Sequence, residues 1–110
     1  MYVDFSAGNK DYKLRLTTRG IVSLEKQIGI NPLMIFGLNG ERIPTVTEMV
    51  HILHASLQAY NHGISLNDAY DIFDAYEADG HQYNDFIPVI VEIYKVSGLI
   101  QSTTGDSEKN

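Results

Sequence analysis

The residues whose types and spacing come closest to a metal site are Glu48, His51 and His54, which follow one another at three-residue intervals in a predicted helix. A Glu-x-x-His pair is half of the ligand set of a carboxylate-bridged di-metal site. The complete site needs a second such pair and further inward glutamates, and the chain has no second copy. The histidines also lack the His-Glu-x-x-His spacing of a metallopeptidase helix. We therefore expect both histidines to face solvent or a partner and predict no metal site.

An acidic turn between two predicted helices, from Asp74 to Phe86, is the second candidate for chemistry. If Gly80 takes the sixth position of a calcium loop, Ala75 is first and Phe86 twelfth, so the first ligand and the bidentate carboxylate are both missing. The sequence also contains no Gly-x-Ser-x-Gly elbow and no phosphate-binding loop. We predict that the protein is not an enzyme and uses no cofactor. We rank the hypothesis of a small metal-dependent enzyme below two non-enzymatic hypotheses in which the protein binds another protein.

Composition narrows the class of protein. The chain has 110 residues and a net charge of -6, which disfavours binding to nucleic acid. It has no cysteine, no signal-like N-terminus and no apolar run long enough to cross a bilayer, so we expect a cytoplasmic protein. Its length predicts a single domain over residues 1–100. Residues 101–110 contain no hydrophobic side chain and predict a disordered tail.

The organising element is a strand that turns directly into a helix. Leu14 and Leu16 alternate with polar residues, and a helical apolar spacing then runs over residues 18–28. Thr17 is placed to cap this helix and Gly29 to end it. A hairpin over residues 1–16 precedes it, and further helices are predicted over residues 45–61, 65–79 and 85–99. Thr45 to Glu48 matches a capping box, and Asn84 or Asp85 is expected to cap the last helix. Gly37 to Arg42 is expected to be a simple connecting loop, although its glycines also make it a possible contact site. The sequence therefore predicts an α+β fold with an N-terminal β-hairpin packed on a small bundle of about four helices.

The last predicted helix is apolar on nearly all sides. One side carries Phe86, Ile90 and Ile93, and another carries Ile87, Val91 and Tyr94. Because one side can face the core and the other a partner, we predict that Ile87, Val91 and Tyr94 bind a partner. The same apolar excess also fits a homo-oligomer.

Three segments near the N-terminus resemble the opening of small tail assembly chaperones from long-tailed phages and prophages, including those related to gene transfer agents. The segments are the Leu-Arg-Leu-Thr-Thr run from Leu14 to Thr18, the pair Leu24-Glu25, and the Gly-Ile-Asn-Pro-Leu run from Gly29 to Leu33. They make up about a quarter of the chain, and the later helical part agrees in length and character only. The motifs are structural and contain no catalytic residue.

The resemblance implies a non-enzymatic role in phage tail assembly. Such chaperones are cytoplasmic, are absent from the finished virion, and occur in short and frameshift-extended forms. They bind the tape measure protein and help recruit the tail tube protein. The alternative from the residues alone is a small helical adaptor or regulator, of the phage or its host, that binds one protein through the last helix.

Overall fold

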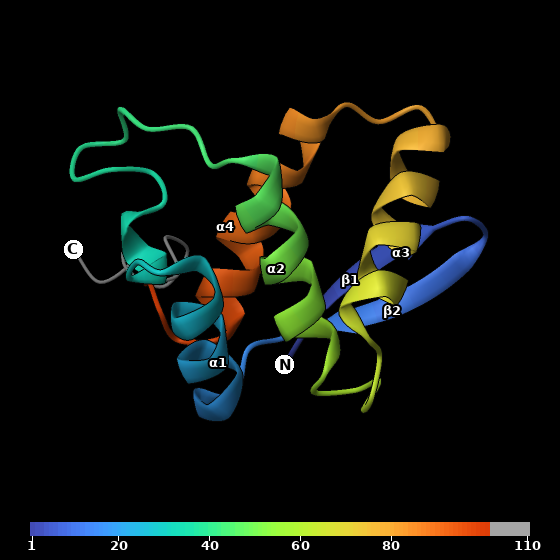
Figure 1. Cartoon of the computed structure of the whole chain (residues 1–110), viewed down its shortest axis with the longest axis horizontal. Coiled ribbons are helices and arrows are strands. Elements are labelled where there is room, and N and C mark those ends of the chain that lie inside the picture. The colour runs from blue at the N-terminus through green and yellow to red at the C-terminus, as the bar shows by residue number, and fades with distance from the viewer. Residues whose placement is uncertain (102–110) are drawn as a thin grey trace, which may run out of the picture.

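The computed structural model describes residues 1–101 and contains an N-terminal hairpin followed by four α-helices (Figure 1). Strands β1 (Val3–Ala7) and β2 (Lys10–Leu14) pair antiparallel, with Val3 opposite Leu14. Gly8 and Asn9 form the two-residue turn between them and both have positive φ, at 59° and 67°. This is the turn geometry whose twist matches that of a β-hairpin, and Gly and Asn tolerate it best.

The four helices are α1 (Thr18–Ile28), α2 (Val46–Leu57), α3 (Leu66–Ala78) and α4 (Phe86–Val96). Short 3₁₀ turns, η1 (Pro32–Met34) and η2 (Tyr83–Asp85), precede α2 and α4 respectively. The α+β prediction of a hairpin and four helices is confirmed. The predicted ends at residues 61 and 99 are a few residues too late, because tight turns follow α2 and a left-handed Gly98 follows α4.

Helices α1, α2 and α3 form one layer with α2 in the middle, and α4 lies behind α2 (Figure 1). Strand β1 contacts both α3 and α4, so the hairpin closes one end of the core. The core contains aliphatic side chains from every α-helix and from β2, and an aromatic cluster where α3, α4 and β1 meet. Its aromatic members are Phe5, Phe73, Tyr76 and Phe86.

Local capping sets where most helices begin. The Thr17 hydroxyl accepts a hydrogen bond from the Gly20 amide at 3.1 Å, as the sequence predicts. Reciprocal capping boxes start α2, between Thr45 and Glu48, and α3, between Ser65 and Asp68. Because these bonds span three residues, they depend on local sequence alone.

The start of α4 differs from the expectation that Asn84 or Asp85 caps it. The Asp85 carboxylate accepts a hydrogen bond from the Gln82 amide at 2.8 Å instead, so it caps the 3₁₀ turn that precedes the helix.

The strand–helix joint is held by contacts from distant parts of the chain. The Leu16 amide donates to the Ser97 hydroxyl at 2.9 Å, and the Arg15 amide donates to the Ser56 carbonyl at 3.0 Å. The Arg15 guanidinium also donates to the Val96 carbonyl at 3.3 Å. The joint therefore ties together the C-terminal ends of α2 and α4. Within residues 1–101, no helix has the length and apolar content needed to cross a membrane.

Candidate functional site

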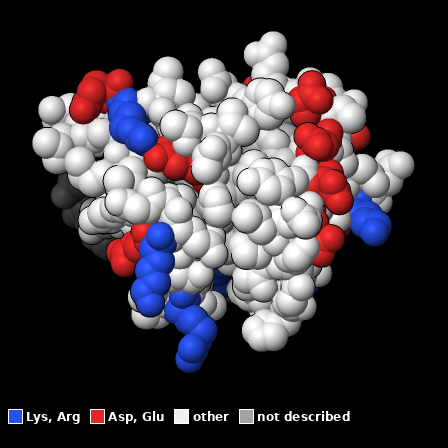
Figure 2. All heavy atoms as spheres, in the orientation of Figure 1, with Lys and Arg blue, Asp and Glu red and all other residues white. Residues whose placement is uncertain are grey.

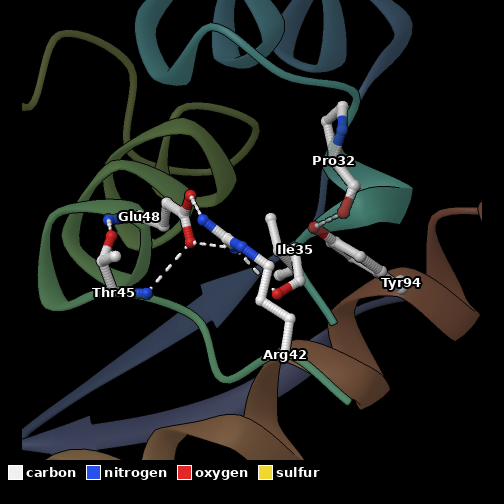
Figure 3. A network of polar contacts seen from close by, with 6 residues as sticks. All are labelled: Pro32, Ile35, Arg42, Thr45, Glu48 and Tyr94. Atoms are coloured by element: carbon white, nitrogen blue, oxygen red, sulfur yellow. Dashed lines mark hydrogen bonds and ion pairs between the residues drawn. The ribbon is translucent and has the colours of Figure 1, made fainter. Parts of the chain in front are cut away.

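Tyr94 is a core residue of α4. Its side chain is 1% exposed, and its hydroxyl donates a hydrogen bond of 2.9 Å to the Pro32 carbonyl in η1 (Figure 3). Burial raises the pKa of the Tyr94 phenol well above its usual value. This corrects the sequence-based placement of Tyr94 on the outward side of the helix. Tyr94 therefore joins the buried stripe of Phe86, Ile90 and Ile93, with its hydroxyl bonded to η1.

Ile87 and Val91 lie one turn apart on the neighbouring side of α4, and both are partly exposed. Ile87 packs against the edge of the core. The structure therefore keeps two of the three predicted contact residues within reach of solvent, and Val91 is the better placed of the pair for a partner. Their role in binding stays a prediction.

The connector between η1 and α2, residues 35–45, presents apolar side chains that sequence reasoning did not select. Leu38 is 80% exposed and Ile43 is 67% exposed. Among the other large hydrophobic residues described, only Met1 is more exposed than Ile43. Single exposed hydrophobes are ordinary on protein surfaces. Two exposed hydrophobic residues on one short, ordered connector form a candidate contact site. We call this site, which consists of Leu38 and Ile43, the connector surface.

Arg42 holds the connector in place (Figure 3). Its guanidinium donates to both carboxylate oxygens of Glu48 and to the Ile35 carbonyl, each at 2.8 Å. The Thr45 amide donates to the same carboxylate at 2.9 Å. Glu48 is only 6% exposed, and the hydrogen bonds from Arg42 keep the pKa of its carboxyl below the usual range. The network therefore fastens the connector to the first turn of α2 and back to its own start at Ile35.

The tip of the connector is a tight turn built around two left-handed glycines. Gly37 and Gly40 have φ of 80° and 78°. The Glu41 carboxylate accepts a hydrogen bond from the Asn39 amide at 2.9 Å, and this bond lowers the pKa of Glu41. The same carboxylate occupies the space that a Cβ at Gly37 would need. Leu38 therefore stands on a backbone that only glycine permits at the preceding position.

The sequence identifies Glu48 as the capping-box residue, and this is confirmed, but its pairing with Arg42 was missed. One signal was present. A capping glutamate that starts a buried apolar helix leaves its second oxygen unsatisfied unless a donor reaches it, and Arg42 lies six residues before it.

The two histidines of α2 do not converge on a common point. The His51 ring bonds to the Gln27 side chain of α1 at 2.9 Å. The Nε2 of His54 donates to the Ile64 carbonyl at 3.0 Å, and its Nδ1 is buried without a partner among residues 1–101. His54 is thus partly buried and bonded within the fold, contrary to the expectation that it faces solvent or a partner. Over the same residues, no group of three or more His, Cys, Asp or Glu side chains is arranged to hold a metal ion.

Comparison with known proteins adds one finding. A family model described as a family of unknown function, DUF6096, matches residues 3–109. The chain belongs to this family. No curated protein and no solved structure gives a significant match.

Proposed function

We propose that this protein is a phage tail assembly chaperone: a non-enzymatic cytoplasmic protein, absent from the mature virion, that binds the tape measure protein and helps recruit the tail tube protein. The observation that carries the proposal is the connector surface. Leu38 and Ile43 are held outward on a connector that Arg42 and Glu48 fasten to α2. The resemblance of residues 14–33 to the opening of such chaperones is the second support.

The physical requirement of the role is a rigid apolar contact that stays dissolved. A tape measure protein exposes long apolar helical surface before the tube encloses it. A connector that is already ordered loses less conformational entropy on binding such a helix than a free loop would. The net charge of -6 opposes aggregation of the complex. Val91 on α4 is partly exposed and offers a second apolar contact.

The test is co-expression with the tape measure protein encoded beside this gene, followed by affinity purification. We compare the wild type with the Leu38→Asp/Ile43→Asp variant and with Val91→Asp. Ala59→Asp serves as the matched control, because Ala59 is exposed and lies beyond the opposite end of α2, about 18 Å along its axis from the connector. Circular dichroism establishes that every variant folds before binding is compared.

We expect the wild type and the Ala59→Asp control to keep the tape measure protein soluble. The connector variant should lose most of the retained partner, because binding would bury two introduced carboxylates against the apolar helix of the tape measure protein. Loss with Val91→Asp would extend the contact to α4. If the folded wild type retains no tape measure protein, the chaperone proposal fails. Specific recovery of a different protein, lost again in the connector variant, would support the alternative of a small adaptor or regulator.

A further inference from the structure

The three-helix layer has two open edges. Helix α2 packs against α1 on one side and against α3 on the other, and Figure 1 shows α1 and α3 as the outer members. Leu24 anchors the inner face of α1, and Phe73 anchors that of α3. Helix α3 also contacts β1 of the hairpin, and Asp71 lines a hollow shared with Lys10 and Tyr12 of β2. The outer face of α1 is therefore exposed, and the exposed part of α3 lies beside the hairpin.

The outer face of α1 is cationic with an apolar centre. Arg19, Val22 and Lys26 recur at three- and four-residue spacing, which places them together on the side opposite Leu24. Val22 is 44% exposed, and both cations are exposed. Neither cation forms an ion pair among the described residues. The one acidic residue of α1, Glu25, lies off this line.

The outer face of α3 has the opposite charge. Asp71 lies opposite Phe73, and Asp74 is exposed between Asp71 and Tyr70 around the helix. Tyr70 is 45% exposed. Asp68 and Glu77 are also exposed, but they lie on opposite flanks of the helix. No Lys or Arg occurs anywhere in residues 43–94, and none of these carboxylates forms an ion pair within the part of the chain described. In Figure 2 acidic residues gather over α3 with a basic side chain beside them, and basic residues gather over α1 with acidic atoms beside them.

We propose that the outer face of α3 in one copy packs against the outer face of α1 in a second copy. Tyr70 then covers Val22, while Asp71 and Asp74 pair with Arg19 and Lys26. Two features select a second copy as the occupant: the faces are complementary in charge, and each combines its charges with one exposed apolar or aromatic side chain, Val22 or Tyr70. Because the two faces differ and lie on opposite edges, the contact is heterologous and continues the α1–α2–α3 layer from copy to copy.

The inferred contact is sensitive to salt. Each copy carries a net charge of -6, so copies repel one another at long range. At about 0.1 M salt the Debye length is about 10 Å, which weakens that repulsion but leaves pairs in direct contact attracted; at about 1 M it is about 3 Å, and exposed pairs are screened as well. Association is therefore expected at the lower salt concentration only. It goes beyond the proposed function and does not rest on it.

Charge reversal at each edge tests the contact by sedimentation velocity. The Asp71→Lys/Asp74→Lys variant has two cationic edges, and the Arg19→Glu/Lys26→Glu variant has two anionic edges. Each variant alone should stay monomeric, while an equimolar mixture should associate again, because every α3 then finds an α1 of opposite charge. The Glu25→Lys variant is a control that changes charge on α1 away from the contact line. Circular dichroism confirms folding of each.

The expected result is a wild-type sedimentation coefficient that rises with concentration at about 0.1 M salt and stays monomeric at about 1 M. Restored association in the mixture would establish which faces meet, independently of any tape measure protein. A wild type that is monomeric at every concentration at the lower salt would overturn the proposal. So would association that both reversed variants retain alone, or a complex that stops at two copies without forming a ring or longer chain.

Discussion

Replacing Glu48 with alanine tests how the connector is held. The substitution removes three hydrogen bonds to one nearly buried carboxylate, from the Thr45 amide and from both terminal nitrogens of Arg42. A hydrogen bond to a charged group contributes about 1.5–3 kcal/mol, but these three share one acceptor group and are not additive. The Arg42 side chain is 37% exposed, so water recovers part of its bonding after the change. We expect Glu48→Ala to lower the free energy of unfolding by about 2–3 kcal/mol.

The assay is urea and thermal unfolding followed by circular dichroism. For a chain of this length the expected loss corresponds to a fall in Tm of about 10 °C. The Glu48→Gln variant keeps an oxygen for the Thr45 amide and a neutral bond to Arg42, so it should lose about half as much. The control is Glu25→Ala on the exposed surface of α1, expected to change stability by less than about 0.5 kcal/mol.

The charge of Glu48 adds a pH signature. Hydrogen bonds from Arg42 hold the folded-state pKa of Glu48 below its ordinary value of 4.5. A carboxyl with a lowered folded pKa contributes stability fully above its unfolded pKa and loses it as the pH falls through the folded pKa. The stability difference between the wild type and Glu48→Gln should therefore narrow on acidification below 4.5. Equal losses in the alanine and glutamine variants, or a difference that does not change with pH, would refute this account.

Three further predictions concern contacts between distant segments. Tyr94→Phe removes the buried hydrogen bond to the Pro32 carbonyl and should cost about 1 kcal/mol in urea unfolding with unchanged helix content; no loss would mean that water replaces the hydroxyl. Asp79→Ala removes the acceptor for the Gly8 amide, 2.9 Å away, and should cost about 0.5–1 kcal/mol and speed amide exchange at Gly8, whereas unchanged exchange would contradict the contact. Partial burial lowers the pKa of His51, so its contribution is present above its ordinary value of 6.5 and lost as the pH falls through the folded pKa. When the pH is lowered from about 7 to about 5, the free energy of unfolding measured in urea should therefore fall less for His51→Gln than for the wild type. Equal falls would contradict a lowered pKa of His51.

Much of the secondary structure is decided within a few residues of sequence. The turn at Gly8 and Asn9 follows from the tolerance of these residues for positive φ. The start of α1 follows from Thr17 and its end from Gly29, whose φ is 76°. In each case the bond or dihedral involves residues at most four positions apart, so the printed sequence contains all that is needed to predict it.

The candidate site was less predictable because it depends on contacts between segments. A helix that is apolar nearly all round has no periodicity that marks its buried side, so the sequence could not tell that Tyr94 faces the core and Val91 does not. The connector was expected to be a simple loop. Its exposed Leu38 and Ile43 gain significance only from the hydrogen bonds that fix the backbone around them.

The sequence by itself determined the hairpin, the four helices, the caps of α1, α2 and α3, and an acidic chain without cysteine. Only the tertiary structure decided that the buried Tyr94 bonds to η1, that Arg42 pairs with Glu48, and that a cationic and an anionic helix flank α2 on opposite sides. The physical reason is the range of the interactions. Turns and caps are closed by neighbouring residues, whereas burial and edge position depend on how whole helices pack, which no short stretch of sequence specifies.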